Sequence, residues 1–373
     1  MSHPLKFRFF AHSWLSDWNH GNAHFLRGLV RELIRLGHEV RCYEQYEAWS
    51  LTHLLQEEGD RAPTAIEEFW RAFPELDVRF YYNDAGFRDF ASEELRGADV
   101  VVVHEWNPPE VVHAISALKR ALGFRLLFHD THHRAYSNPK EMLRLPLSEF
   151  DGVLAFGEAI RRIYRDAFGI QKAWTFHEAA DTSHFRPLPA KKKAADIVWV
   201  GNWGDEERSQ ELQEFLIGPA AALRGAEVAV HGVRYPEEGR RKLAAAGIAF
   251  RGYLPNLRAP RVYAESMVTV HIPRRQYANG LSGVPTIRVF EALACGIPLL
   301  CAPWMDAENL FRPGEDYLCL PDGRAMAAEL SRLLSDPAAC RQMAARGLQT
   351  IQARHTCAHR ATQLLEICEE LGK

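Results

Sequence analysis

The sequence predicts an α/β protein with two doubly wound parallel-sheet domains in succession. Short apolar runs alternate with segments whose apolar residues repeat at helical spacing, which is typical of parallel strands connected by helices. This alternation pauses at a stretch rich in proline and lysine, residues 187–193, and then starts again. The length of 373 residues is long for one hydrophobic core and sufficient for two.

The first half opens with a strand at 6–11, a helix from Gly21 to Leu36 that Gly37 ends, and a second strand at 38–43. This order is the first unit of a parallel sheet. Further strands are expected at 78–82, 99–104, 124–129, 152–156 and 173–177.

The second half is expected to begin with a strand at 196–201 and a helix at 208–217 that stops at Gly218 and Pro219. The tail from Asp336 onward is predicted to be helical. The remaining strands of the second half are expected at 226–231, 247–251, 267–272 and 298–302.

Composition argues against nucleic-acid binding, a disulfide framework and an integral membrane protein. Lys and Arg number 45 against 48 Asp and Glu, and the net charge of −3 provides no general field for capturing nucleic acid. The seven cysteines are odd in number and contain no Cys-x-x-Cys pair, which favours reduced thiols and a cytoplasmic location. No stretch approaches the ~20 apolar residues of a membrane-spanning helix, so no integral membrane segment is expected.

Residues 286–298 are the most informative segment. Thr286 suits an N-cap, Gly296 suits the position after the last turn, and Pro298 follows, so a short helix is predicted between them. A diphosphate can bind the free N–H groups of the first turn, around Thr286 and Ile287, with Arg288 as its countercharge. Glu291, one turn on, can accept hydrogen bonds from ribose hydroxyls. The alternative is an ordinary amphipathic helix with a solvated Glu291.

Absent motifs constrain the chemistry. The chain has no Asp-x-Asp, no Gly-x-Gly-x-x-Gly after the first strand and no Gly-x-x-x-x-Gly-Lys-Ser/Thr. We therefore expect no metal and no cofactor, and cationic side chains must neutralise the leaving group. Besides Arg288, the candidates are Arg208, which opens a helix after the loop containing Asn202, and then Arg274 with Arg275.

Two loops follow strands of the first half and are expected at the carboxyl edge of its sheet, where ligands bind in such folds. In the loop at 13–22, Gly21 and Asn22 allow close backbone approach to a ligand, and Trp14 or Trp18 can stack on a sugar face.

The second loop contains Phe128-His129-Asp130-Thr131-His132-His133. Three imidazoles around a carboxylate can form a metal site, but one short loop without a fourth ligand disfavours it. Residues 290–298 resemble the donor-site helix of the GT-B glycosyltransferases, and this resemblance implies acceptor contacts from His132 and a catalytic base among Asp130, His129 and His20.

Three segments in order resemble the GT-B glycosyltransferases. Residues 290–298 resemble the donor-site helix, 250–255 with Tyr253 resemble the strand and loop that hold the donor base, and 181–187 resemble the end of the first domain. The CgeB-like branch, related to family 4 glycosyltransferases, is the most similar group. This resemblance implies the GT-B architecture: two Rossmann-like domains, 1–187 on the acceptor side and 188–345 on the donor side, facing across a cleft, and a C-terminal helix, 346–373, that returns to the first domain.

The chain departs from family 4 at one position. Family 4 enzymes have a glutamate eight residues before the one that matches Glu291, and this chain has Gly283 there. The paired-glutamate motif is therefore half present.

The leading hypothesis is a metal-independent hexosyltransferase that moves a sugar from a nucleotide-sugar donor to an acceptor hydroxyl, with retention of the anomeric configuration as the resemblance implies. The acceptor is not defined by the sequence. A sugar-nucleotide epimerase on the same fold and a non-catalytic nucleotide-sugar binding protein are the alternatives, and Gly283 is the argument for the last.

Overall fold

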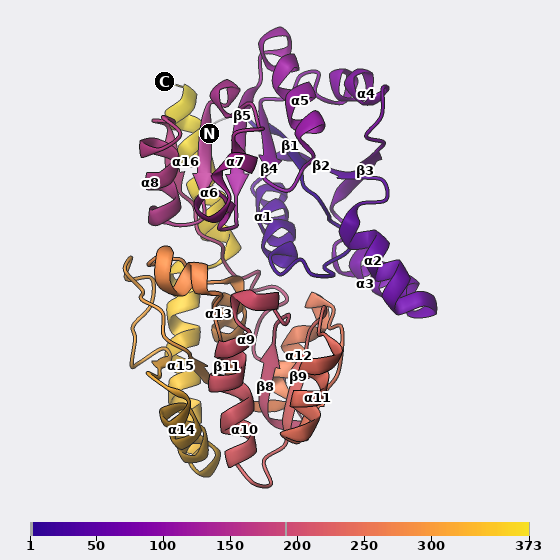
Figure 1. Cartoon of the computed structure of the whole chain (residues 1–373). Coiled ribbons are helices and arrows are strands. Elements are labelled where there is room, and N and C mark those ends of the chain that lie inside the picture. The colour runs from indigo at the N-terminus through magenta and orange to yellow at the C-terminus, as the bar shows by residue number, and fades with distance from the viewer. Residues whose placement is uncertain (1–2, 191, 373) are drawn as a thin grey trace. The chain divides into compact units, whose positions relative to one another are not determined.

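The structure of the protein is a computed structural model that describes residues 3–190 and 192–372. The chain forms two compact units (Figure 1). The first unit takes the chain up to Glu178 and again from Cys357, and the second unit is Ala179–Thr356.

The first unit is built on a seven-stranded parallel sheet with the strand order β3-β2-β1-β4-β5-β6-β7. The order reverses between β1 and β4, so these adjacent strands carry their chains away in opposite directions. This is the doubly wound sheet that the sequence predicts. The strands are β1 (Lys6–Phe10), β2 (Glu39–Gln45), β3 (Asp77–Tyr81), β4 (Val100–His104), β5 (Arg125–Asp130), β6 (Gly152–Ala155) and β7 (Ala173–Thr175).

Helices cover this sheet. The first, α1, ends where Gly37 takes a φ of +89°, a left-handed conformation that favours glycine. The last, α16, packs against α1 and is anchored by the Trp174 indole, which donates to Glu370 at 2.9 Å (Figure 1). The helices are α1 (Ala23–Arg35), α2 (Trp49–Glu58), η1 (Gly59–Arg61), α3 (Ala62–Ala72), α4 (Phe87–Glu94), α5 (Pro109–Leu122), α6 (Arg134–Ser137), α7 (Pro139–Met142), η2 (Leu147–Glu149), α8 (Glu158–Asp166) and α16 (Cys357–Gly372).

The second unit repeats this plan with a six-stranded sheet of order β10-β9-β8-β11-β12-β13, also parallel. Its order reverses between β8 and β11. The strands are β8 (Ala195–Val200), β9 (Val228–His231), β10 (Ile248–Phe250), β11 (Ser266–His271), β12 (Leu299–Cys301) and β13 (Leu318–Cys319). The helices are η3 (Asp205–Glu207), α9 (Ser209–Leu212), η4 (Gln213–Ile217), α10 (Gly218–Ala222), α11 (Glu237–Ala245), η5 (Asn256–Arg258), α12 (Ala259–Ala264), η6 (Gln276–Gly280), α13 (Ile287–Ala294), α14 (Gly323–Ser335) and α15 (Pro337–Arg354).

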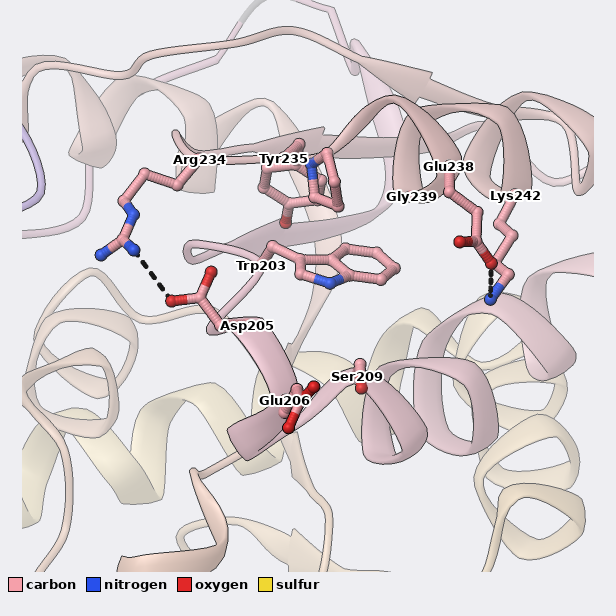
Figure 2. Close-up of a pocket in the computed structure, with 10 residues that line it drawn as sticks. Trp203, Asp205, Glu206, Ser209, Arg234, Tyr235, Glu238, Gly239 and Lys242 are labelled. Atoms are coloured by element: carbon pink, nitrogen blue, oxygen red, sulfur yellow. Dashed lines mark hydrogen bonds and ion pairs between the residues drawn. The ribbon is translucent and has the colours of Figure 1, made fainter.

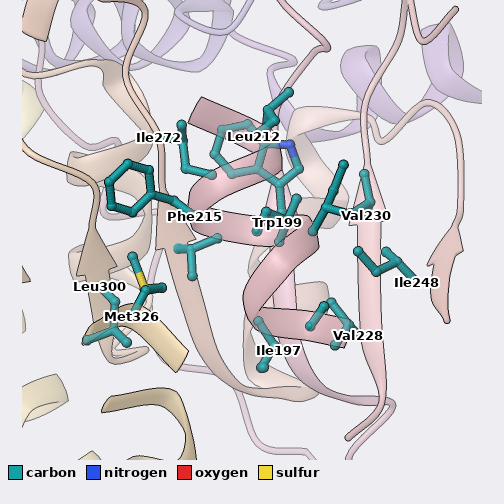
Figure 3. Close-up of a cluster of buried hydrophobic side chains, with 14 of the residues drawn as sticks. Ile197, Trp199, Leu212, Phe215, Val228, Val230, Ile248, Ile272, Leu300 and Met326 are labelled. Carbon is teal, nitrogen blue, oxygen red and sulfur yellow. The ribbon is translucent and has the colours of Figure 1, made fainter. Parts of the chain in front are cut away.

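The core of the second unit lies between this sheet and its helices. Figure 3 shows Trp199 of β8 among side chains from α9, η4 and β9 and beside Ile272, which follows β11, and Trp199 is 1% exposed. The ends of β8 and β9 approach backbone to backbone, because a Cβ at Gly232 would lie 2.1 Å from the Gly201 carbonyl oxygen. Glycine is therefore required where these two strands end.

Two sequence expectations for this unit are wrong in detail. The helix expected to stop at Gly218 and Pro219 continues to Ala222, because a wide π-helical turn precedes Gly218 and places Pro219 in the first turn of α10, where its missing N–H costs little. The short strand β13 is not predicted by the sequence, since Leu318 and Cys319 give too short a pattern.

No helix among the described residues is long and apolar enough to cross a bilayer.

Candidate functional site

The first candidate site lies where the strand order of the second unit reverses. β8 and β11 are neighbours in the sheet, and the loops that follow them leave toward opposite sides. Ligands in open α/β sheets bind at this switch point, outside the carboxyl ends of the strands. The residues after β8 include Asn202 and Arg208, and those after β11 include Arg274.

Helix α13 begins at this same edge. Thr286 is its N-cap residue, as predicted, but its side chain does not cap the helix. Its hydroxyl instead hydrogen-bonds to Nε2 of His271, the last residue of β11, at 2.9 Å. This bond fixes the amino end of α13, with Ile287 in its first turn, at the end of β11. The first N–H groups of a helix lack partners within the helix, so this end is suited to an anion.

Arg208 joins the two exit loops. Its guanidinium donates to the carbonyl of Asn202 at 2.5 Å and to that of Ile272 at 3.2 Å, and it lies over the Trp199 ring. The residue is 8% exposed, and its Nε atom has no hydrogen-bond partner among the described residues. Burial, followed by the nearby charge of Arg274, lowers the pKa of Arg208 to about 9.

Arg208, Arg274 and Arg288 form a cationic cluster. Their charges act on one another, since Arg274 and Arg288 both lower the pKa of Arg208. Carboxylates balance part of this charge: Arg274 pairs with Glu207, and Arg288 pairs with Glu291 one turn along α13. A buried cation beside other cations is stabilised by an incoming anion. The cluster thus has the charge and place to hold a diphosphate.

Glu291 is fully buried in α13, and its Oε2 atom pairs with Arg288. A ribose hydroxyl reaches this carboxylate only if the guanidinium shifts. The solvated glutamate of the alternative interpretation is therefore wrong for Glu291.

The remaining predicted donor residues line the same edge. The Asn202 side-chain oxygen accepts from the N–H of Val233 at 3.2 Å and thereby ties the loop after β8 to the loop after β9. Tyr253 is half-buried and follows Gly252, whose carbonyl accepts from the N–H of Gly232 at 2.8 Å. Hydrogen bonds thus connect the loops that follow β8, β9 and β10.

A cavity of about 640 Å³ opens beside the loop after β8 (Figure 2). Trp203 lies at its centre, and its charged lining is largely paired: Arg234 contacts Asp205 at 2.9 Å, and Lys242 contacts Glu238 at 2.8 Å. None of the predicted donor residues is among the described residues that line it. The cationic cluster is therefore distinct from this cavity.

Gly283 has a φ of +90°, a conformation that disfavours other residues. A Cβ there would lie 2.9 Å from Cγ of Glu308. A glutamate at position 283 would strain the backbone and displace Glu308, which explains locally why this chain has glycine.

The second candidate site lies at the switch point of the first unit, between β1 and β4. His12 and His20 come from the loop after β1, and His104 ends β4. The ring centroids of His12 and His20 are 3.8 Å apart, and those of His12 and His104 are 5.3 Å apart. We call His12, His20, His104 and the adjoining His129 the imidazole cluster; the His104 and His129 rings are 5.4 Å apart.

The imidazole cluster is uncharged. Burial lowers the pKa of His12 and of His129 to about 3, and lowers that of His20 and His104 well below the usual range. Both ring nitrogens of His20, Nδ1 of His12 and Nε2 of His129 are buried and have no hydrogen-bond partner among the described residues. The cluster therefore offers neutral hydrogen-bonding groups that the protein itself leaves available.

Asp130 lies deeper than a catalytic base requires. It is fully buried, it accepts from the Tyr164 hydroxyl at 2.5 Å and from the His132 N–H at 2.9 Å, and it hydrogen-bonds to Glu105. Burial raises the pKa of both carboxyls, and that of Glu105 is raised well above its usual range. Burial thus favours the protonated form of these carboxyls, and Asp130 is the least suited of the three base candidates.

Two buried charged residues, Glu44 and Arg27, hold the loop after β1 in place. The buried Glu44 carboxylate accepts from the N–H groups of Trp14 and Leu15 at 2.6 and 3.0 Å. The buried Arg27 donates to the Trp14 carbonyl at 2.8 Å and pairs with Asp17 at 3.1 Å. These contacts position the backbone that carries His12 and His20.

The predicted sugar stacking on the loop tryptophans is wrong. Trp14 is fully buried and donates to the Tyr43 carbonyl, and Trp18 is 1% exposed. Both rings pack in the core because the loop folds inward over β2. Gly21 and Asn22 are half-buried just before α1, and Asn22 is its N-cap residue.

Sequence analysis missed His12 and the buried Glu44. His12 carries a usable signal, since it follows the first strand by two residues and belongs to the edge where ligands bind. Nothing in the sequence places Glu44 beneath the loop, because that contact depends on the pairing of β1 with β2. Among residues 3–190 and 192–372, no group of three or more His, Cys, Asp or Glu side chains is arranged to hold a metal ion.

Comparison with known proteins finds one matching family and several solved structures with a similar fold. Residues 208–366, which include the predicted donor residues from Arg208 to Glu291, match the family described as Glycosyl transferase-like. No curated protein matches the sequence of this chain.

Solved structures share the fold at low sequence identity. HepE from Anabaena, solved with UDP and glucose, aligns at a TM-score of 0.71 and 13% identity over 98% of this chain and 100% of its own. A glycosyltransferase from Rickettsia africae aligns at 0.68 and 12% over 100% of both chains. Sucrose-phosphate synthase from Thermosynechococcus elongatus aligns at 0.65 and 15% over 98% and 99%.

The solved structures show that the chain has the fold of the GT-B glycosyltransferases, and the family match covers less than half of the chain. The two parallel sheets are the two Rossmann-like sheets expected from the sequence. Its second half, from Arg208 onward, is the part that matches the Glycosyl transferase-like family.

Proposed function

We propose that this chain transfers a hexosyl group from a UDP-linked sugar to an acceptor hydroxyl, without a metal ion and with retention of the anomeric configuration. The buried Arg208 carries the proposal. It is a cation at the switch point, beside Arg274 and Arg288, and its Nε atom has no hydrogen-bond partner in the described part of the chain. UDP is favoured because HepE, a protein of the same fold, was solved with UDP and glucose.

The donor diphosphate lies in this proposal against the amino end of α13, between Thr286 and the cationic cluster. Arg288 turns from Glu291 to the diphosphate, and Glu291 then accepts from the ribose hydroxyls. Charge that develops on the leaving diphosphate is stabilised by fixed guanidinium groups and helix N–H groups, which need no divalent ion. The residues that bind the donor are Asn202, Arg208, Tyr253, Arg274, Thr286, Ile287, Arg288 and Glu291.

The acceptor binds at the imidazole cluster. His20 and His129 hold its hydroxyl, with further contacts from His132 and from the backbone at Gly21 and Asn22. In a retaining reaction the leaving phosphate takes the hydroxyl proton, so no strong base is required. An inverting reaction would require one of the neutral imidazoles as base.

The family assignment and the location belong to the same proposal. Motifs at 181–187, 250–255 and 286–298 favour the CgeB-like branch, and Gly283 is its departure from family 4. We also assign the acceptor side to residues 1–187, the donor side to 188–345 and the returning helix to 346–373. The seven cysteines, all free thiols, favour the cytoplasm.

A non-catalytic nucleotide-sugar binding protein is the second candidate, and Gly283 favours it. That protein would bind UDP-glucose tightly, and mass analysis after incubation with an acceptor panel would find the donor intact. An epimerase would instead isomerise the sugar in the absence of any acceptor. Transfer to an acceptor with release of UDP supports the proposal over both.

Titration calorimetry with UDP tests the donor site. Arg288→Ala removes a charge-assisted contact to the diphosphate, so UDP binding weakens by about 1.5–3 kcal/mol. Arg275→Ala is the matched control, because Arg275 also follows β11 but pairs with Glu211 at 2.6 Å and is outside the cationic cluster. Unchanged UDP affinity in Arg288→Ala would contradict the assignment.

A further inference from the structure

We propose that the acceptor is a saccharide and that the indole of Trp106 is the platform on which one of its rings lies, with a hydroxyl directed to the imidazole cluster. This inference rests on the proposed function, since it names the acceptor of the same site. It adds Trp106 to that site.

Trp106 is exposed at the carboxyl edge of the sheet. It follows β4 by two residues, directly at the switch point, and 42% of its surface is accessible. An exposed indole at a position where ligands bind in this class of fold is an available apolar surface.

The ring is held in one orientation. The Arg134 guanidinium lies over the indole at 4.0 Å from the ring centroid, and it is fixed in turn by Glu105 at 3.1 Å. The His132 ring meets the indole edge-on, 5.1 Å away. A braced aromatic ring loses little conformational entropy when a ligand covers it.

Neutral polar groups adjoin the indole. The His12 ring is 6.3 Å from that of Trp106, and it lies 3.8 Å from the His20 ring and 5.3 Å from the His104 ring. Buried nitrogens of His12 and His20 have no protein partner among the described residues. A neutral imidazole has one donor and one acceptor nitrogen, which matches a hydroxyl group.

This combination matches a sugar ring better than other acceptors. A pyranose has an apolar C–H face, which packs on an indole, and hydroxyls around its rim, which bind neutral donors and acceptors. An aliphatic acceptor would need a continuous apolar wall, whereas the groups next to Trp106 are polar. An anionic acceptor would need cationic charge, and Arg134 already pairs with Glu105.

Saturation-transfer NMR on the whole protein tests the inference without any donor. The probes are glucose, galactose, N-acetylglucosamine, maltose and lactose, with phenol and serine amide as non-saccharide probes. At least one saccharide is expected to receive saturation, strongest on the C–H protons of one face. Trp106→Ala weakens this binding by about tenfold, and Trp106→Phe retains most of it. Trp70→Ala in α3, whose ring is 39% exposed, is the matched control and leaves binding unchanged.

Three results would overturn the inference: no saccharide binds, phenol or serine amide alone binds at Trp106, or Trp106→Ala binds saccharide as the parent does. UDP is titrated into the same samples. Absence of saccharide binding in the parent protein, with normal UDP binding, rejects the acceptor inference alone. Failure of UDP binding in the parent protein rejects the proposed function instead, so the two failures are distinguishable.

Discussion

At the switch point of the second unit, three arginines lie around the amino end of α13, whereas at that of the first unit, a cluster of four imidazoles adjoins an exposed tryptophan. The sheets are alike, with parallel strands and one reversal of order. The difference lies in the residues that follow the central strands. One topology thus provides two kinds of site: a cationic one suited to a diphosphate and a neutral one suited to hydroxyl groups.

The two exit loops are also fastened in different ways. In the second unit, Arg208 spans the loops after β8 and β11 and is itself a candidate ligand for the donor. In the first unit, Glu44 and Arg27 hold the loop after β1 from below and leave His12 and His20 available. In the proposed donor site one residue, Arg208, both supports the loops and binds the ligand, whereas in the proposed acceptor site different residues have these two roles.

The largest expected difference between the units is their response to acid. A histidine whose pKa is lowered by folding contributes stability that is present above pH 6.5 and is lost as the pH falls. Each fully buried imidazole costs about 2 kcal/mol between pH 6.5 and pH 5. The first unit contains the four histidines of the imidazole cluster, and the second contains His231 and His271, whose pKa values are lowered by burial to about 4 and 3, so acid should destabilise the first unit more.

Hydrogen exchange measured by mass spectrometry at pH 7 and pH 5, corrected for intrinsic rates, compares the two units. Peptides from β1, β4 and β5 should lose protection before peptides from β8 and β11. Equal loss in both units would break the comparison. A His12→Gln variant, which cannot titrate there, should reduce the difference.

Glu44 is expected to act in the opposite direction. Burial raises its pKa to about 7 from 4.5, in spite of the hydrogen bonds from Trp14 and Leu15 and the nearby Arg27. Its stabilising contribution is present below pH 4.5 and is lost as the pH rises through 7, by about 3 kcal/mol. Tyr81 also faces this carboxyl.

Urea unfolding of the parent and of Glu44→Gln at pH 5 and pH 8 measures this effect. The parent should lose about 3 kcal/mol relative to the variant between these values. A difference independent of pH would show that Glu44 does not titrate in this range. Saccharide binding by Glu44→Gln at pH 8, compared with that of the parent, then reports whether the contacts of Glu44 with the loop after β1 position His12 and His20.

Arg208→Lys separates charge from geometry in the donor site. Lysine keeps the cation but cannot span the Asn202 and Ile272 carbonyls, so UDP affinity should fall by about 2 kcal/mol, or roughly 30-fold. Saccharide binding at Trp106 should be unchanged. Arg275→Lys, measured by the same calorimetry, should bind UDP as the parent does, and an equal loss in both variants would argue against a specific role for Arg208.

The smallest predicted effect concerns His20. In a retaining reaction its imidazole holds the acceptor hydroxyl, so His20→Ala should raise the acceptor KM by about tenfold, the value of one hydrogen bond, with a small change in kcat. A fall in kcat of about 10² or more would instead indicate a general base and an inverting reaction. His113→Ala on the exposed face of α5 is the control.

Local pattern was sufficient for much of this structure. The apolar runs predict the thirteen strands except β13, and Thr286 and Gly296 mark the limits of α13. Which loops lie at the carboxyl edge follows from the strand–helix alternation alone. The sequence therefore places Arg208, Arg288, His20 and the other candidates at the right edges of their sheets.

Only the tertiary structure decides which side chains meet and which are exposed. Strand order places His12 against His20 and His104, buries Trp14 and Asp130, and leaves Trp106 accessible. It also directs the Thr286 hydroxyl to His271 instead of to its own helix. Spacing along the chain determines which edge of a sheet a residue occupies, but burial, pKa and hydrogen-bond partners depend on neighbours that are distant in the sequence.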